Sequence, residues 1–277
     1  MGDLLDALLA PLSQGFVRRA LGAGLALGAA GSLLGVFVVQ RGLGLLSDGL
    51  AHATFGGLAL GLLLGAAVDR AIWIALPFTV AIALGIQHVR RRTTLGGDVA
   101  TGVFFAVSFA AGILFLGLRS ARAQPVNVEG LLFGSLLAVS PEALVVILAV
   151  AALVAVVLAW TGPRLAYATF DPELAALSGV PVAALEYLLL ALTALVVVVG
   201  VKTVGVVLVS AFVVIPAATA SLLGRTLGTI AAFAVGLSAL GTAFGLFASY
   251  HLNVATGATI ILTLGAMFFL ALLLRRR

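Results

Sequence analysis

Apolar runs of about 20 residues recur along the whole chain, separated by short stretches that hold most of the charged residues. A helical run of that length matches the ~30 Å hydrocarbon core of a membrane. The runs do not alternate apolar and polar residues, as the strands of a membrane β-barrel do. The pattern predicts an all-α polytopic membrane protein with about eight or nine transmembrane helices. We place the apolar segments at residues 20–39, 45–65, 71–89, 99–117, 141–160, 183–201, 203–223, 228–250 and 254–274.

Two further stretches fit the membrane surface better than its interior. Residues 1–19 are expected to form a short interfacial helix. Leu131 to Val139 is apolar but too short to span, which predicts a re-entrant or interfacial piece. No polar stretch is long enough for a separate soluble domain, so residues 1–277 are expected to form a single transmembrane domain.

Composition excludes an ordinary soluble protein. The chain is 63% hydrophobic and 9% charged, whereas soluble domains carry roughly 25% charged residues. It contains no cysteine, which excludes disulfides and thiolate metal sites. The net charge of +5 is not read as a nucleic-acid signal, because the arginines lie at the ends of the apolar segments. The expected surroundings are membrane lipid.

The arginines also predict an orientation. One side of the membrane receives most of them: Arg41, Arg164, Arg225 and the triplets at 90–92 and 275–277. The positive-inside rule makes that side cytoplasmic. The C-terminus is then inside, the N-terminus outside, and the protein is a multi-pass protein of the plasma membrane, the inner membrane in a Gram-negative bacterium.

Asp48 and His52 are the most unusual residues of segment 45–65. Four residues apart on a helix, they share one face, and charged groups at such depth are usually functional. A carboxylate with an imidazole suits a divalent transition metal. One chain offers only two ligands, so a second copy would be needed for a tetrahedral site. The alternative is an internal hydrogen bond that only satisfies two polar groups.

The same segment carries small residues at every fourth position: Gly49, Ala53, Gly57, Gly61 and Gly65. Such a stripe allows another helix to approach closely. We interpret it, together with the half metal site, as a sign of a homodimer. His251 lies near the outer end of segment 228–250; it is a weaker candidate for receiving a metal, and the alternative is a solvated helix end.

The loop at 167–182, "YATFDPELAALSGVPV", predicts a short helix closed at both ends. Asp171 suits an N-cap, Pro172 the first helical position and Glu173 the first turn. Gly179 suits the residue after the helix, and Pro181 prevents its continuation. The alternative is a plain connector.

Segment 203–223 contains Pro216 well inside its apolar run, and Gly205 near its start. An internal proline removes a helical hydrogen bond, and broken membrane helices usually line a cavity. Gly205 and Pro216 are therefore candidates for a gating break. The alternative is a kink without a function.

No catalytic motif is visible. There is no H-E-x-x-H and no G-x-x-x-x-G-K-[ST]. The nearest string, "VVVVGVKT", has a valine between Gly200 and Lys202. The chain is therefore expected neither to hydrolyse ATP itself nor to hold a cofactor stably.

Four motifs, in this order, resemble the permease subunits of bacterial ATP-binding-cassette importers for zinc, manganese and iron. They are "LSDGLAHATFGGLALGLLLG", "LFGSLLAVSPEAL", "FDPELAALSGVPV" and "VGVVLVSAFVVIPAATASLL". The resemblance covers nearly the whole chain. The wording around Asp48 and His52 is most similar to the zinc members, although the chain has Ser135 where those carry an acidic residue.

The resemblance implies a transport subunit, not an enzyme. Two permease copies would form a homodimeric pore with alternating access, driven by a cytoplasmic ABC ATPase dimer and loaded by an extracytoplasmic solute-binding protein. Asp48 and His52 would meet the metal in transit, with Zn²⁺ the first expectation and Mn²⁺ or Fe²⁺ the alternatives. The loop residues Asp171, Glu173, Leu174 and Gly179 would couple to the ATPase.

Two other functions fit the sequence less well. An ion-coupled secondary transporter of a small solute would predict inverted repeats, which are not apparent, and it would leave the capped loop without a partner. An intramembrane enzyme would need a catalytic set, and none is visible in the sequence.

Overall fold

The computed structural model describes residues 13–119 and 134–275, and every regular element in these two ranges is a helix. Nine of the helices have 18 residues or more: α2 (Gly15–Gln40), α3 (Leu46–Leu63), α4 (Val68–Arg92), α5 (Gly97–Leu118), α7 (Pro141–Phe170), α9 (Val182–Val204), α10 (Val206–Leu223), α11 (Leu227–Leu252) and α12 (Thr256–Arg275). Two short elements complete the described chain: a 3₁₀ turn, η2 (Leu136–Ala138), and a six-residue helix, α8 (Pro172–Leu177).

Eight of the long helices are long and apolar enough to cross a membrane. The exception is α3, whose mean hydropathy is lowered by Asp48 and His52. The prediction of eight or nine transmembrane helices is confirmed, and the chain is a multi-pass protein of the plasma membrane.

Two helices differ in extent from the prediction. α2 begins at Gly15, so Arg18 and Arg19 lie in its first turns and not in a separate interfacial helix; residues 1–12 of that predicted helix lie outside the described residues. α7 has 30 residues. At 1.5 Å per residue it is about 45 Å long, which exceeds the ~30 Å of a hydrocarbon core, so its last turns extend beyond the membrane toward α8.

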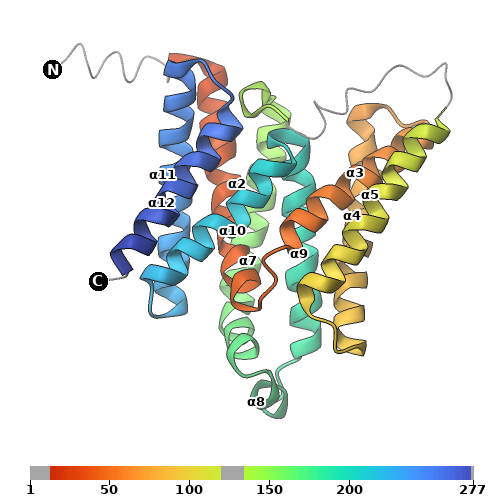
Figure 1. Cartoon of the computed structure of the whole chain (residues 1–277), viewed down its shortest axis with the longest axis vertical. Coiled ribbons are helices and arrows are strands. Elements are labelled where there is room, and N and C mark those ends of the chain that lie inside the picture. Colours follow the sequence, from red (N-terminus) through yellow and green to blue (C-terminus); the bar gives the residue numbers. More distant parts are fainter. Residues whose placement is uncertain (1–12, 120–133, 276–277) are drawn as a thin grey trace.

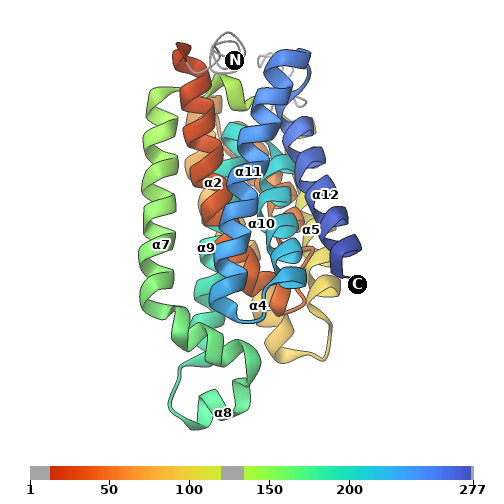
Figure 2. The ribbon, with the colours of Figure 1, turned by 90° about the vertical axis from the view of Figure 1, so that its left-hand side faces the viewer.

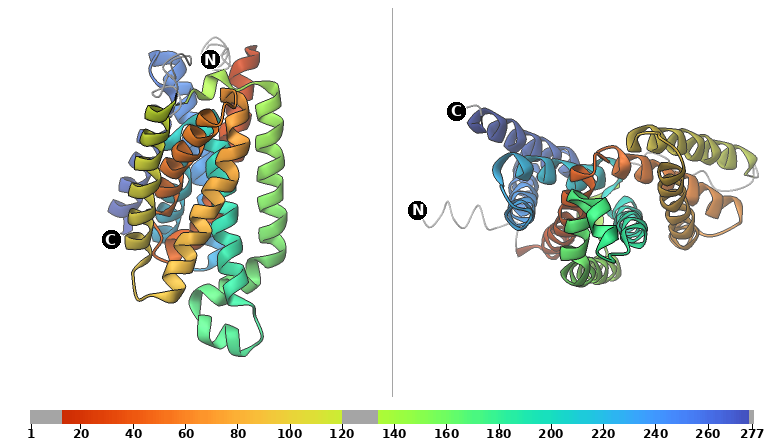
Figure 3. Two further views of the ribbon diagram at one scale, coloured as in Figure 1. Left: turned by 90° about the vertical axis from the view of Figure 1, so that its right-hand side faces the viewer. Right: turned by 90° about the horizontal axis from the view of Figure 1, so that it is seen from below.

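The helices form three groups (Figure 1). α3, α4 and α5 make up one flank, α11 and α12 the other, and α2, α7 and α9 lie between them. The view from below separates the two flanks clearly (Figure 3). α10 packs against α2, α11 and α12, so it joins the centre to the α11–α12 flank.

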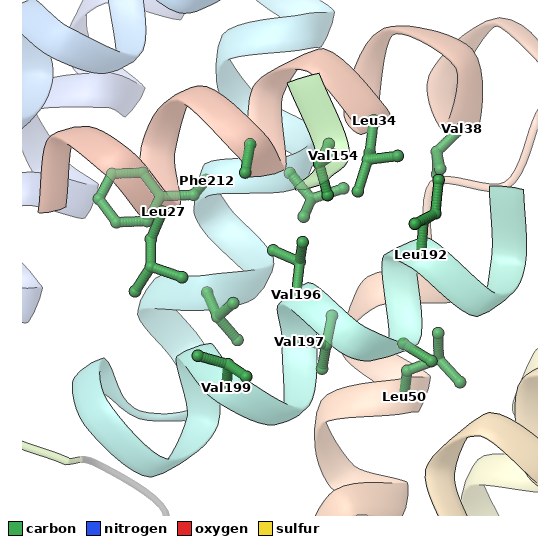
Figure 4. Packing of buried hydrophobic residues seen from close by; sticks show 14 of the residues in the cluster. Leu27, Leu34, Val38, Leu50, Val154, Leu192, Val196, Val197, Val199 and Phe212 are labelled. Carbon is green, nitrogen blue, oxygen red and sulfur yellow. The ribbon is translucent and has the colours of Figure 1, made fainter. Parts of the chain in front are cut away.

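The core is centred on α9 (Figure 4). Its side chains Leu192, Val196 and Val197 lie among residues of α2, α3, α7 and α10, and Phe212 of α10 is fully buried beside them. Burial of such aliphatic and aromatic side chains fixes how the central helices pack, and α3 is held to this core through Leu50, which is also fully buried.

α8 projects from one end of the molecule (Figure 2). The same end receives the α2–α3 connection with Arg41, the α4 C-terminus with Arg90, Arg91 and Arg92, and the α10–α11 connection with Arg225. This distribution agrees with the predicted cytoplasmic side. Of the triplet at 275–277, only Arg275 belongs to the described residues.

The predicted short segment at Leu131 to Val139 is described only from residue 134 onward. That part does not span: it forms the turn η2 at the end opposite α8, with Leu136 buried. Gly134 approaches the α9–α10 junction so closely that a Cβ at this position would collide with the backbone of Val204 and Gly205.

Candidate functional site

Most of α3 is buried against its neighbours α4 and α5. A Cβ at Gly57 would lie 2.7 Å from the Ala75 Cα of α4, and one at Gly61 would lie 3.0 Å from the Ala71 Cα. Gly49 approaches Thr101 of α5 in the same way. The predicted close packing along the small-residue stripe is therefore present. Its partners belong to the same chain, however, so the stripe at these positions does not supply a face for a second copy.

Asp48 and His52 lie on the one side of α3 that remains open. The Asp48 side chain is 53% exposed and the His52 side chain 26%, whereas Gly49, Leu50 and Ala51 between them are buried. The His52 Nδ1 lies 3.7 Å from an Asp48 carboxylate oxygen. The two side chains therefore point to the same region, as the spacing predicted.

The His52 ring is held in a defined orientation. Its Nδ1 lies 3.0 Å from the Asp48 main-chain carbonyl oxygen, which can only accept a hydrogen bond, so Nδ1 is the protonated nitrogen. The ring meets Phe105 and Phe109 of α5 edge-on, at centroid distances of 4.9 and 5.7 Å. In the neutral ring this arrangement leaves Nε2 as the nitrogen that can bind a metal, as in metal-binding histidines whose other nitrogen donates to a carbonyl.

Within the described residues, Asp48 and His52 have no further metal-binding side chain beside them. No group of three or more histidine, cysteine, aspartate or glutamate residues converges anywhere in the described ranges. His251 lies exposed in the last turn of α11, where its ring contacts Tyr250. It is on the flank opposite α3 (Figure 1), so the structure does not bring it to Asp48 and His52.

The predicted capped helix is present as α8. The Asp171 carboxylate accepts a hydrogen bond from the Leu174 amide at 2.9 Å, and Pro172 occupies the first helical position. Gly179 has the left-handed conformation, with φ of 79°, that ends the helix. Leu174 is 51% and Leu177 86% exposed. A short helix that is capped at both ends therefore presents two exposed leucines beyond the ends of the membrane-spanning helices.

The predicted break is at Gly205 and not at Pro216. α10 continues through Pro216 to Leu223. Gly205 separates α9 from α10 with φ of 91° and ψ of 165°, a conformation that favours glycine. A proline removes only one helical hydrogen bond, and in this structure α4 and α7 also continue through internal prolines.

A polar cluster that the sequence did not reveal lies where α7 and α9 lead into and out of α8. It consists of Arg41, Gln87, Arg91, Thr169 and Glu186, which we call the Glu186 cluster. Its two central residues are separated by 145 positions. From the sequence, Arg41 indicates only the cytoplasmic side of the membrane, and no local pattern indicates its partner Glu186.

Comparisons with known proteins place this geometry in a family. The model of the ABC 3 transport family matches residues 13–275. The chain is 32% identical over 262 residues to the manganese transport system membrane protein MntC of Listeria innocua, covering 95% of this chain and 91% of that protein. It is also 32% identical over 255 residues to the manganese import system permease protein ScaB of Streptococcus parasanguinis, covering 92% and 89%.

A solved structure agrees over the same length. PsaBC from Streptococcus pneumoniae in complex with Fab is similar with a TM-score of 0.82 and 28% sequence identity, covering 96% of this chain and 95% of that one. The family model and the relatives both span nearly the whole described chain, and the arrangement of the helices agrees with them. This chain is a member of the ABC 3 transport family.

Proposed function

We propose that this chain is the membrane-spanning subunit of an ATP-driven importer of divalent transition metal ions, and that Mn²⁺ is its main cargo. The observation that carries the proposal is the pair of Asp48 and His52 on the open side of an otherwise buried helix. Two named relatives are manganese systems. Zn²⁺, which the sequence motifs favoured, remains the competing cargo, with Fe²⁺ next.

The ligands themselves suit either ion. Carboxylates suit Mn²⁺ and imidazole suits Zn²⁺, so two Asp48 and two His52 side chains from a homodimer would form a mixed site. Mg²⁺ and Ca²⁺ prefer oxygen ligands alone. Since Zn²⁺ binds a given set of nitrogen and oxygen ligands more tightly than Mn²⁺ does, it should compete with Mn²⁺ for this site. A proton competes with the metal for an imidazole nitrogen, so metal binding should weaken as the pH falls.

The remaining parts follow from the same proposal. A cytoplasmic ABC ATPase dimer would bind the exposed leucines of α8 and drive alternating access. An extracytoplasmic solute-binding protein would deliver the metal. The Gly205 junction, at the end opposite α8, is the candidate hinge of the gate.

The test is uptake of labelled Mn²⁺ and Zn²⁺ into proteoliposomes that contain the chain with its partner ATPase, with the solute-binding protein supplied on the side from which the metal is taken up. We expect ATP-dependent Mn²⁺ uptake that excess Zn²⁺ inhibits. Asp48→Asn and His52→Ala should each lower uptake at least tenfold, which corresponds to about 1.4 kcal/mol of lost interaction with the ion. His88→Ala, which removes an exposed imidazole at the end of α4, is the matched control and should import at the parental rate.

Two results would contradict the proposal. Uptake that requires an ion gradient and not ATP would favour a secondary transporter. Parental uptake in both site variants, with unchanged preference between Mn²⁺ and Zn²⁺, would make Asp48 and His52 structural.

A further inference from the structure

The Glu186 cluster connects side chains from four helical regions: the end of α2, α4, the end of α7 and α9. One Glu186 oxygen lies 3.3 Å from Arg41 Nη1. The other accepts hydrogen bonds from Gln87 Nε2 at 2.7 Å and from Arg91 Nη1 at 3.3 Å. The Arg41 side chain is 7% exposed and that of Glu186 is 19% exposed, so the central pair is largely removed from water.

Arg41 is bonded to both helices that flank α8. Its Nε donates to Thr169 Oγ1 at 3.0 Å, and Thr169 lies near the end of α7, two residues before the cap residue Asp171. Its Nη1 meets Glu186, which lies one turn inside α9. Any displacement of α8 that shifts the ends of α7 and α9 therefore acts on the Arg41 guanidinium.

Arg41 is also joined to the start of α3 by a short turn held by backbone hydrogen bonds. It is the residue at which α2 ends, and the turn that follows is closed by backbone hydrogen bonds from Leu43 to Val38 and from Leu46 to Leu43, both 3.0 Å. Leu43 and Leu46 are fully buried. Asp48 lies in the first turn of α3, so movement of Arg41 changes the position of the metal ligand.

Stability alone does not account well for such a cluster. Taking ionic groups out of water costs free energy, and buried pairs are often no better for stability than well-packed apolar groups. Burial lowers the pKa of the Arg41 guanidinium below its ordinary value, Glu186 opposes this, and neighbouring Arg90 adds to the lowering. Burial therefore disfavours the charged form of Arg41, and keeping this guanidinium at the site costs free energy. In return, Arg41 connects the helices on either side of α8 with the start of α3.

We infer that Glu186 and Arg41 are positioning residues that transmit the movement of α8 to the metal-binding end of α3. This inference rests on the proposed function, because α8 moves only if an ATPase acts on it. Neither residue touches the ion. Loss of the connection should leave ATP hydrolysis and metal binding intact while fewer ions are imported per ATP.

The experiment uses the chain reconstituted with its partner ATPase and supplied with the solute-binding protein, and it measures Mn²⁺ uptake and ATP hydrolysis on the same vesicles. Glu186→Gln keeps the shape and removes the charge. We expect the ratio of imported Mn²⁺ to hydrolysed ATP to fall at least about fivefold, the lower range of a typical coupling effect. The maximal uptake rate should fall while the KM for Mn²⁺ stays at the parental value, because Asp48 and His52 are unchanged.

Three further variants keep the inference testable if Glu186→Gln folds poorly. Arg91→Ala removes a partner that is 42% exposed, so it should lower the ratio less and leave folding intact. Glu186→Asp retains the charge and should give an intermediate ratio. Arg92→Ala, the matched control, removes an exposed charge from the same helix end and should leave the ratio at the parental value.

The two proposals fail in different ways. The parental chain could import Mn²⁺ with ATP while Glu186→Gln and Arg91→Ala import as many ions per ATP as the parental chain does. This result would overturn only the role of the cluster and leave the proposed function standing. An equal fall in the ratio of Mn²⁺ to ATP in Arg92→Ala would also overturn the role of the cluster, because loss of any positive charge at this helix end would then have the same effect. A parental chain without ATP-dependent uptake would overturn the proposed function itself.

Discussion

At the scale of single residues, the sequence was most informative where both partners lie on one helix. Asp48 and His52 could be paired from their spacing alone, because positions four apart share a face, and the structure places their side chains together. The glycines of α3 also predicted close packing, but not the identity of the neighbour. Periodicity shows that a helix can approach, and only the tertiary arrangement shows that α4 and α5 do so.

The close approach of α3 and α4 gives a prediction with an unusual sign. In a solvated helix, Gly→Ala is favourable by up to ~1 kcal/mol. At Gly57 the new Cβ would lie 2.7 Å from the Ala75 Cα and 3.1 Å from the Phe78 side chain. We expect Gly57→Ala to destabilise the protein by about 1–3 kcal/mol, as overpacking does.

The measurement is the thermal unfolding midpoint of the purified protein in detergent. Gly102→Ala on α5 is the control, because a Cβ there meets no atom within 4 Å, and its midpoint should stay equal or rise. Equal midpoints for Gly57→Ala and the parental protein would mean that α3 and α4 are packed less closely than the structure shows.

At the scale of elements, local chemistry again decided what the sequence could predict. The signals that bound α8 all lie within one short stretch, from Asp171 to Pro181, and the helix is present as expected. Of the two candidates for the helix break, Gly205 is confirmed as the junction and Pro216 is not, because a proline marks only a lost hydrogen bond, whereas the junction depends on the positive φ of Gly205 and its close approach to Gly134. The Glu186 cluster was missed because its partners are far apart in the chain.

The exposed end of α8 gives the second prediction. Leu174 and Leu177 are 51% and 86% exposed, and they are the apolar side chains of α8 that a bound ATPase would cover. We expect Leu177→Asp to prevent co-purification of the chain with its ATPase and to stop ATP-driven uptake. Asp171→Ala removes the cap, at a cost of about 1 kcal/mol to this helix, and charge reversal at Asp171 or Glu173 alters the charges at the same helix start. All three changes should weaken the coupling.

Folding should survive all these changes, because α8 lies outside the predicted spans and only Ala175 of it is buried. Glu142→Lys is the control, since it reverses a charge at the other end of α7 and should still co-purify. Unchanged assembly and uptake for Leu177→Asp would reduce α8 to a connector.

At the scale of the whole molecule, hydropathy was enough to predict the spans, because helix length and apolar content are local properties. It could not predict the assembly. One chain brings two candidate ligands to the open side of α3, and no third histidine, cysteine or carboxylate joins them within the described ranges. Since the glycine stripe is used inside the chain, the prediction of a homodimer now rests on the proposed metal site alone.

Completion of that site by a second copy makes a geometric prediction. If two Asp48–His52 pairs bind one ion, the two α3 helices must meet near their first turns, and residues on the same side must face their own counterparts. Leu45 is three positions before Asp48 and is 56% exposed. The chain has no native cysteine, so Leu45→Cys introduces a single thiol. Mild oxidation of membranes containing this variant should give a covalent dimer on a denaturing gel, and bound Mn²⁺ should change its yield.

Leu262→Cys is the control, because Leu262 is 72% exposed on α12, in the flank opposite α3 (Figure 1). Cross-linking through Leu262→Cys in place of Leu45→Cys would put the two-fold axis at the wrong flank, and a strictly monomeric chain with full uptake would leave the metal with only two ligands.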